Sequence, residues 1–129
     1  MSEGAVSNVS VSGATVLVID GNDHMRALVR ATLQALGVAT IAEARDGNAA
    51  LRRLAAVRPD LVICDAGTEG AGKVLEQAPG MPPVVLLTGP SGAPDLADRA
   101  AAVLEKPVSA KKLYAIMAGI LGDGTVSPD

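Results

Sequence analysis

Two carboxylates and one ammonium group stand at the ends of short, mainly apolar runs in this chain. Asp20 follows "VLVI", Asp65 follows "LVIC", and Lys106 closes "AAVLEK". A carboxylate at the end of a buried strand is costly to hold without a partner, and two carboxylates that lie close together repel one another. A cation is therefore expected beside them, either the lysine ammonium or a hard divalent ion such as Mg²⁺, which prefers oxygen ligands.

A fourth apolar run, "VVLL", ends at Thr88, whose hydroxyl adds a neutral hydrogen-bond donor. A carboxylate nucleophile, a hard metal ion, a lysine and a hydroxyl together suit a transferred phosphoryl group, whose charge is spread over its oxygens. Each residue alone also has a structural explanation, such as a helix cap for Asp20 or a turn residue for Thr88. Only the joint placement of all four at successive strand ends favours the chemical interpretation.

The elements that must position these residues alternate between strand and helix. Continuous apolar runs predict strands covered on both faces, and apolar residues at helical spacing after a cap residue predict helices. The predicted strands are 15–20, 38–43, 61–64, 84–87 and 102–105, and the predicted helices run from Asn22 or Asp23 to Gly37, over 46–57, 73–77 and 95–101, and from Ser109 to Leu121. Such alternation predicts a parallel sheet with right-handed crossovers, helices on both faces and a binding crevice at the carboxyl ends of the strands.

Four segments, taken in order, resemble the receiver domain of bacterial two-component response regulators, including the chemotaxis regulators. They are "VLVIDGNDHMR", "PDLVICD", "VVLLTG" and "LEKP", and the resemblance covers residues 15 to about 121. It implies a flavodoxin-like, doubly wound (βα)5 α/β fold with a parallel five-stranded sheet in the order 2-1-3-4-5. We therefore expect a receiver domain over residues 14–121, a flexible leader over 1–13 and a flexible tail over 122–129.

The resemblance also implies roles for the polar residues. Asp65 matches the phosphoacceptor, which takes a phosphoryl group from a histidine kinase or a phosphotransfer protein. Lys106 matches the lysine that pairs with the phosphoryl oxygens, and Thr88 matches the switch hydroxyl that moves toward them. The bond between Lys106 and Pro107 matches a peptide bond that is commonly cis in the family. A downstream effector protein is implied but not named by the sequence.

For the metal, the resemblance implies Mg²⁺ held by Asp20, Asp65 and the backbone carbonyl of Gly67. The family usually has a second acid directly after the first, at the position of Gly21 in this chain. A missing carboxylate should weaken Mg²⁺ binding, because affinity follows the number and charge of the ligands. Asp23 is a candidate replacement ligand, although it also suits the cap of the first helix.

Other departures from the family pattern favour an alternative function. The stretch "AGTEGAG" after Asp65 predicts a shorter and looser loop, the fourth helix is expected to be truncated, and Val103 stands where the family often has an aromatic switch residue. The alternative is a degenerate receiver that acts as a phosphorylation-independent protein-interaction module. We do not expect an enzyme, since a phosphate-ester hydrolase would need another acid or base near Asp65 and only Asp23 is available.

Composition limits the remaining function classes. The 129 residues suit one domain, and with 49% hydrophobic residues but no Phe or Trp and one Tyr, stacking on nucleic-acid bases is disfavoured. A net charge of −3, with basic residues scattered along the chain, argues against direct binding to nucleic acid or to a membrane surface. One buried-type cysteine, Cys64, and the lack of a signal-peptide pattern predict a cytoplasmic protein.

Overall fold

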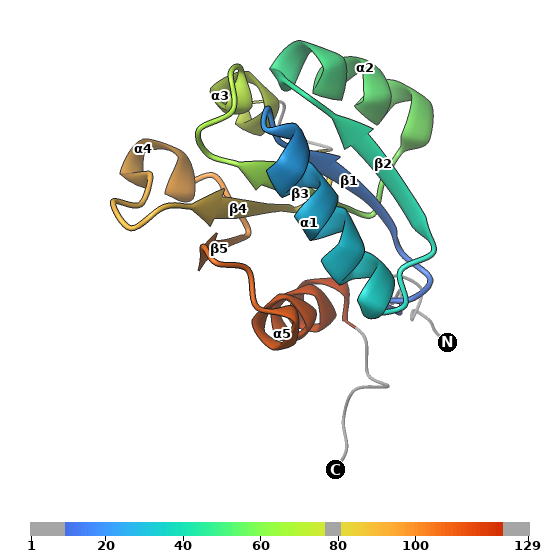
Figure 1. The fold of residues 1–129 in the computed structure, drawn as a ribbon. Coiled ribbons are helices and arrows are strands. Elements are labelled where there is room, and N and C mark those ends of the chain that lie inside the picture. The colour runs from blue at the N-terminus through green and yellow to red at the C-terminus, as the bar shows by residue number, and fades with distance from the viewer. Residues whose placement is uncertain (1–9, 77–80, 123–129) are drawn as a thin grey trace.

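The computed structural model describes residues 10–76 and 81–122, which form a five-stranded sheet with helices between the strands (Figure 1). Neighbouring strands pair in parallel, in the order β2-β1-β3-β4-β5. The strands are β1 (Thr15–Ile19), β2 (Thr40–Ala44), β3 (Leu61–Asp65), β4 (Val84–Thr88) and β5 (Ala102–Glu105). The helices are α1 (Asp23–Ala35), α2 (Gly47–Val57), α3 (Ala71–Leu75), α4 (Pro94–Ala97) and α5 (Ala110–Leu121). The predicted flavodoxin-like α/β fold is confirmed, strand order included.

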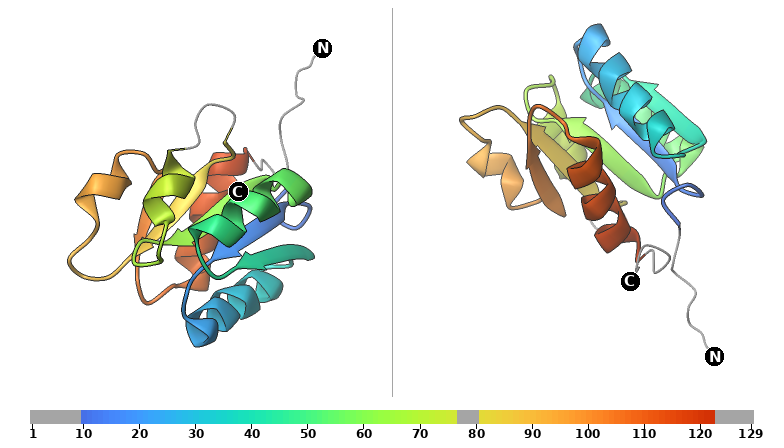
Figure 2. Two further views of the ribbon diagram at one scale, coloured as in Figure 1. Left: turned by 90° about the horizontal axis from the view of Figure 1, so that it is seen from above. Right: turned by 60° about the horizontal axis from the view of Figure 1, so that its bottom comes forward.

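The three central strands are buried on both faces, which explains their continuous apolar sequences. Side chains alternate along β1, so that Val16 and Val18 join a core cluster with α1 and α5, while Leu17 and Ile19 join a second cluster with α2 and α3. Helices α1 and α5 cover one face of the sheet, and α2 and α3 cover the other (Figure 2). The sheet is therefore a rigid support for residues at its carboxyl edge.

Three helices begin at a side chain that accepts a backbone hydrogen bond, as expected for N-cap residues. Asn22 Oδ1 accepts from the N–H of Met25 at 2.9 Å before α1. Asp46 and Ser109 serve α2 and α5 in the same way. The cap of α1 is thus Asn22, and the expectation that Asp23 caps this helix is wrong, because Asp23 is already its first residue.

Several predicted boundaries move. Strand β2 begins at Thr40 instead of residue 38, although Val38 is buried. Helix α3 starts at Ala71, after Gly70 in a left-handed conformation with φ of 83°, instead of at residue 73. Helix α4 is truncated, as expected, but it ends at Ala97 instead of residue 101. Beyond it, the N–H of Ala101 donates to the carbonyl of Val84 in the sheet, at 2.8 Å.

The described part of the predicted leader is residues 10–13. Val11 is 1% exposed and belongs to the core cluster of α1 and α5, whereas Ser12 and Gly13 are exposed. Residues 1–9 and 123–129, the rest of the predicted leader and tail, lie outside the described residues. Across residues 10–76 and 81–122, no helix is both long enough and apolar enough to cross a membrane.

Candidate functional site

The carboxyl ends of β1 and β3 bring Asp20 and Asp65 to one edge of the sheet, because these strands are neighbours. An open cavity of about 470 Å³ lies there. Its lining comes from the loops after β1, β2 and β3: Asp20, Gly21, Asn22, Arg45, Asp46, Asp65, Gly67, Thr68 and Glu69. Of the four residues predicted to converge, Asp20 and Asp65 line this cavity, and Thr88 and Lys106 do not.

The Asp65 carboxylate is held by donors on both of its oxygens. Lys106 Nζ, which reaches over from the end of β5, donates to Oδ1 in a close ion pair. The other oxygen, Oδ2, accepts from the N–H of Gly67 at 3.0 Å and from the hydroxyl of Thr68 at 3.3 Å. The side chain is 15% exposed and that of Lys106 is 26% exposed, so the pair is partly shielded and still open to a small reactant.

Asp20 is more deeply buried, at 3% exposed. Its Oδ1 accepts from the N–H of Asn22 at 2.9 Å, but its Oδ2 is buried without any hydrogen-bond partner. Burial raises the pKa of this carboxyl, the Asn22 hydrogen bond opposes the rise, and the negative charge of Asp65 adds to it. A buried carboxylate oxygen without a partner is unfavourable, so this atom marks a place for a cation.

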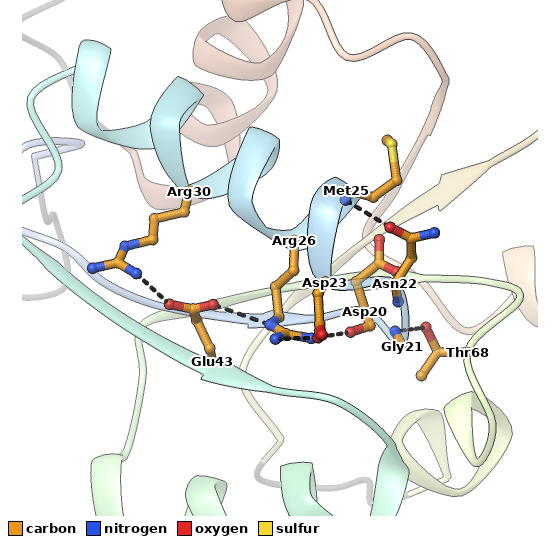
Figure 3. Close-up of polar contacts among 9 residues, drawn as sticks. All are labelled: Asp20, Gly21, Asn22, Asp23, Met25, Arg26, Arg30, Glu43 and Thr68. Atoms are coloured by element: carbon orange, nitrogen blue, oxygen red, sulfur yellow. Dashed lines mark hydrogen bonds and ion pairs between the residues drawn. The ribbon is translucent and has the colours of Figure 1, made fainter.

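Sequence reasoning missed Thr68, which connects two loops of the site. Its hydroxyl accepts from the N–H of Gly21 at 3.2 Å (Figure 3) and also reaches Asp65. The only sequence signal for it was a hydroxyl residue three positions after Asp65. The neighbouring segment is anchored too, since the N–H of Gly47 donates to Glu69 O at 2.8 Å. The expectation of a loose loop after Asp65 is therefore wrong.

Arg26 organises the outer side of the site (Figure 3). Its guanidinium donates to the carbonyl of Asp20 at 2.8 Å, to Asp23 Oδ1 at 2.7 Å and to Glu43 Oε1 at 3.0 Å. Glu43 also accepts from Arg30 at 2.9 Å. The Asp23 side chain is 81% exposed and turned toward Arg26, so a role as a replacement metal ligand would require it to leave this ion pair.

Comparison with known proteins decides the family. The model of the response regulator receiver domain matches residues 16–118, which is most of the chain. The chain belongs to the response regulator receiver domain family. A receiver domain is a signalling module. Among curated proteins, no sequence gives a significant match.

Solved structures agree with this assignment. The receiver domain of NtrX from Brucella abortus is 28% identical, with a TM-score of 0.71 over 84% of this chain and 99% of that chain. The chemotaxis response regulator CheY4 of Vibrio cholerae is 26% identical, with a TM-score of 0.68 over 84% of this chain and 98% of that chain. A longer NtrX chain from Brucella abortus in complex with ADP is 28% identical, with a TM-score of 0.74 over 88% of this chain but only 27% of that chain.

Three further positions of the receiver pattern lie in β4, in β5 and directly after β5. Thr88 is 3% exposed at the end of β4, where its carbonyl accepts from the N–H of Lys106 at 2.9 Å. The Lys106–Pro107 peptide bond is cis, as the resemblance implied. Val103, in place of the aromatic residue, is 44% exposed on β5. A backbone hydrogen bond thus joins the residue that carries the proposed switch hydroxyl to Lys106.

The residues present fit Mg²⁺, with a reduced donor set. Among the described residues, no three His, Cys, Asp or Glu side chains gather to hold an ion by themselves. Mg²⁺ in proteins is nevertheless commonly held by one or two carboxylates and retains several waters. Two carboxylates line the cavity here, from Asp20 and Asp65, and one oxygen of Asp20 has no partner. A Cβ at Gly21 would approach only the Arg45 carbonyl, at 3.4 Å, so the missing acid leaves open space.

Proposed function

We propose that this receiver domain accepts a phosphoryl group on Asp65 from a histidine kinase or a phosphotransfer protein and passes the signal to an effector protein. The observation that carries the proposal is the close ion pair between Lys106 Nζ and Oδ1 of Asp65, a residue that lines an open cavity. A lysine ammonium in this place pairs with the carboxylate and lies where charge develops on an incoming phosphoryl group.

In the proposed reaction the Asp65 carboxylate attacks phosphorus and a new oxygen–phosphorus bond forms. The bond from phosphorus to the donor breaks, and the leaving group keeps the electron pair. A carboxylate nucleophile attacks as the anion, so the proposed step needs no general base. Lys106 neutralises charge on the phosphoryl oxygens, and the hydroxyl of Thr88 supplies a neutral donor to them.

We assign Mg²⁺ as the cofactor, held by Asp20, Asp65 and the carbonyl of Gly67. When bound, it would neutralise the negative charge that the phosphoryl group brings to the two carboxylates. Asp20 is suited to this role because it lines the cavity, its Oδ2 has no partner, and the N–H of Asn22 restrains its other oxygen. Asp23 is the further candidate ligand. Because Gly21 carries no acid, we propose that the affinity for Mg²⁺ is weak.

The test is covalent labelling by acetyl phosphate, a small donor that needs no partner protein. We expect wild-type protein with Mg²⁺ to gain the mass of one phosphoryl group, and we expect Asp65→Asn to gain none. Asp95→Asn changes an exposed aspartate on α4 and is the matched control, which should label like wild type. Labelling of Asp65→Asn at the wild-type level, or no labelling of wild type, would exclude the proposal.

A phosphorylation-independent interaction module is the second candidate, and two observations favour it. The first is Gly21, which leaves the metal site one acid short. The second is α4, a four-residue helix without a buried residue, together with the exposed Val103 on β5. If this candidate is right, Mg²⁺ and beryllofluoride, a mimic of the phosphoryl group, will leave the amide NMR spectrum unchanged.

A further inference from the structure

Thr68 is a buried residue whose hydroxyl touches two parts of the proposed phosphoacceptor site. Its side chain lies in the loop between β3 and α3, and the residue is 7% exposed. Oγ1 lies 3.2 Å from the amide nitrogen of Gly21 and 3.3 Å from Asp65 Oδ2. Thr68 thus joins the loop after β1, which lacks the second acid, to the carboxylate that would receive the phosphoryl group.

The chemistry of the partners fixes the direction of both hydrogen bonds. A backbone N–H can only donate, so the Thr68 oxygen accepts from Gly21. An ionised carboxylate can only accept, so the hydroxyl proton points at Asp65 Oδ2. When a hydroxyl accepts one hydrogen bond and donates another, the accepted bond polarises the hydroxyl and strengthens the bond that it donates. Thr68 is therefore an oriented donor, although its hydroxyl can rotate in principle.

The two oxygens of Asp65 are held in different ways. Oδ2 accepts from the Gly67 N–H and from Thr68, which are short, well-anchored groups in the same loop. Among the described residues, the hydrogen-bond donor on Oδ1 is Lys106, a long side chain that can follow the phosphoryl oxygens as the new bond forms. Oδ1 is therefore the oxygen that is easier to release for attack.

We propose that Thr68 is a positioning residue for phosphorylation. Its hydroxyl, aligned by the Gly21 amide, holds Oδ2 so that Oδ1 of Asp65 faces the incoming phosphorus. The oxygen–phosphorus bond forms at Oδ1, the bond from phosphorus to the donor breaks, and the electron pair leaves with the donor. This inference rests on the proposed function, because it concerns how the same carboxylate reacts.

The contact also gives a reason why a receiver with glycine at position 21 can keep its carboxylate in place. The loop that carries Thr68 is itself anchored. A Cβ on Gly47 would lie 2.4 Å from the carbonyl oxygen of Gly70, so α2 and this loop are in backbone contact. The loop cannot shift far without breaking this contact. Thr68 is therefore supported from both sides, by Gly21 and by the start of α2.

The test compares two variants with wild type in the acetyl phosphate reaction, with the initial rate measured over a range of donor concentrations. Thr68→Val keeps the shape and removes the hydroxyl, while Thr68→Ser keeps the hydroxyl. We expect Thr68→Val to lower the maximal rate about tenfold, the effect of one hydrogen bond to a charged group, with the half-saturating donor concentration unchanged. Thr68→Ser should recover most of the wild-type rate.

If Thr68→Val fails to fold, Thr68→Ala against Thr68→Ser gives the same contrast in a smaller side chain. The melting temperature and the amide NMR resonances of Gly67 identify a variant whose loop has collapsed. Equal maximal rates for Thr68→Val and wild type, or failure of Thr68→Ser to recover the rate, would overturn the role of Thr68 while leaving the phosphoacceptor intact. No labelling of wild type would instead overturn the proposed function itself.

Discussion

The buried carboxylate of Asp20 is unfavourable for stability but suited to binding a cation. Its Oδ2 is buried without a partner, and burial raises the pKa of the carboxyl above the usual aspartate value. A carboxyl whose pKa is raised in the folded protein stabilises the fold at pH values below the pKa that it has in the unfolded chain. This contribution is lost as the pH rises through the raised pKa of the folded state. At neutral pH the metal-free protein therefore holds an unfavourable ionised group, which a bound cation would relieve.

This conflict predicts the effect of Asp20→Asn. Without Mg²⁺ at neutral pH, the variant should be more stable than wild type by about 1 kcal/mol in the free energy of unfolding, because a buried charge without a partner is removed. The gain should shrink as the pH falls below the usual aspartate pKa, where wild-type Asp20 is neutral in both states. Denaturant unfolding at several pH values measures it, and a gain that does not depend on pH would contradict this explanation.

Gly21 is the residue at which the site departs most from its family. Because a Cβ there would approach only the Arg45 carbonyl at 3.4 Å, a side chain can be added with little rearrangement. We expect Gly21→Asp to raise the affinity for Mg²⁺ about tenfold, since the donor set gains a charged ligand. Calorimetric titration measures the affinity, and Gly21→Ala is the steric control. An equal gain from Gly21→Ala would refute the ligand explanation.

The strands that position the site could be predicted from the sequence, but the contacts of the loops between them could not. The runs before Asp20 and Asp65 identified β1 and β3, because parallel central strands are apolar on both faces. The loop after β3 could not be predicted, since its order comes from tertiary contacts: the Thr68 hydroxyl on Gly21, and the backbone of Gly70 against Gly47. Glycine-rich sequence indicates freedom in an isolated chain, whereas here it permits close packing.

The contact between α2 and this loop gives a direct test. Gly47→Ala would place a Cβ 2.4 Å from the Gly70 carbonyl oxygen, and the clash is with backbone, which cannot rotate away. We expect a loss of about 2 kcal/mol in the free energy of unfolding, as for other overpacked sites. Gly119→Ala in α5 is the matched control, because a Cβ there has nothing within 4 Å. Gly119→Ala should raise the free energy of unfolding by about 0.5–1 kcal/mol, because alanine has the higher helix propensity. Equal changes from both substitutions would contradict the packing argument.

In the molecule as a whole, the parallel pairing of the strands was predictable because alternating strands and helices favour right-handed crossovers, whereas the strand order was predicted from the resemblance to the receiver family. The convergence of Asp20, Asp65 and Lys106 followed from the same rule and is present in the fold. The identity of the polar contacts was not predictable, since Asn22 instead of Asp23 caps α1 and Asp23 is paired with Arg26. Those outcomes depend on which of two adjacent side chains reaches its partner, and spacing along the sequence does not decide it.

Binding of Mg²⁺ should stabilise the whole domain by mass action, because the unfolded chain has no assembled carboxylate pair. We expect the melting temperature to rise with millimolar MgCl₂ by more than it does with NaCl at the same ionic strength. The rise should disappear in Asp20→Asn, which lacks one carboxylate of the cavity. A melting temperature that responds equally to both salts would argue against a metal site.

The most direct measurement is a titration of the ¹⁵N-labelled protein with Mg²⁺, followed by beryllofluoride. We expect saturable shifts of the amide resonances of Gly21, Gly67 and Thr68, which surround the Asp65 carboxylate. We expect no such shifts in Asp65→Asn. Wild-type spectra that stay unchanged at saturating beryllofluoride, or shifts that persist in Asp65→Asn, would contradict phosphoryl acceptance at Asp65.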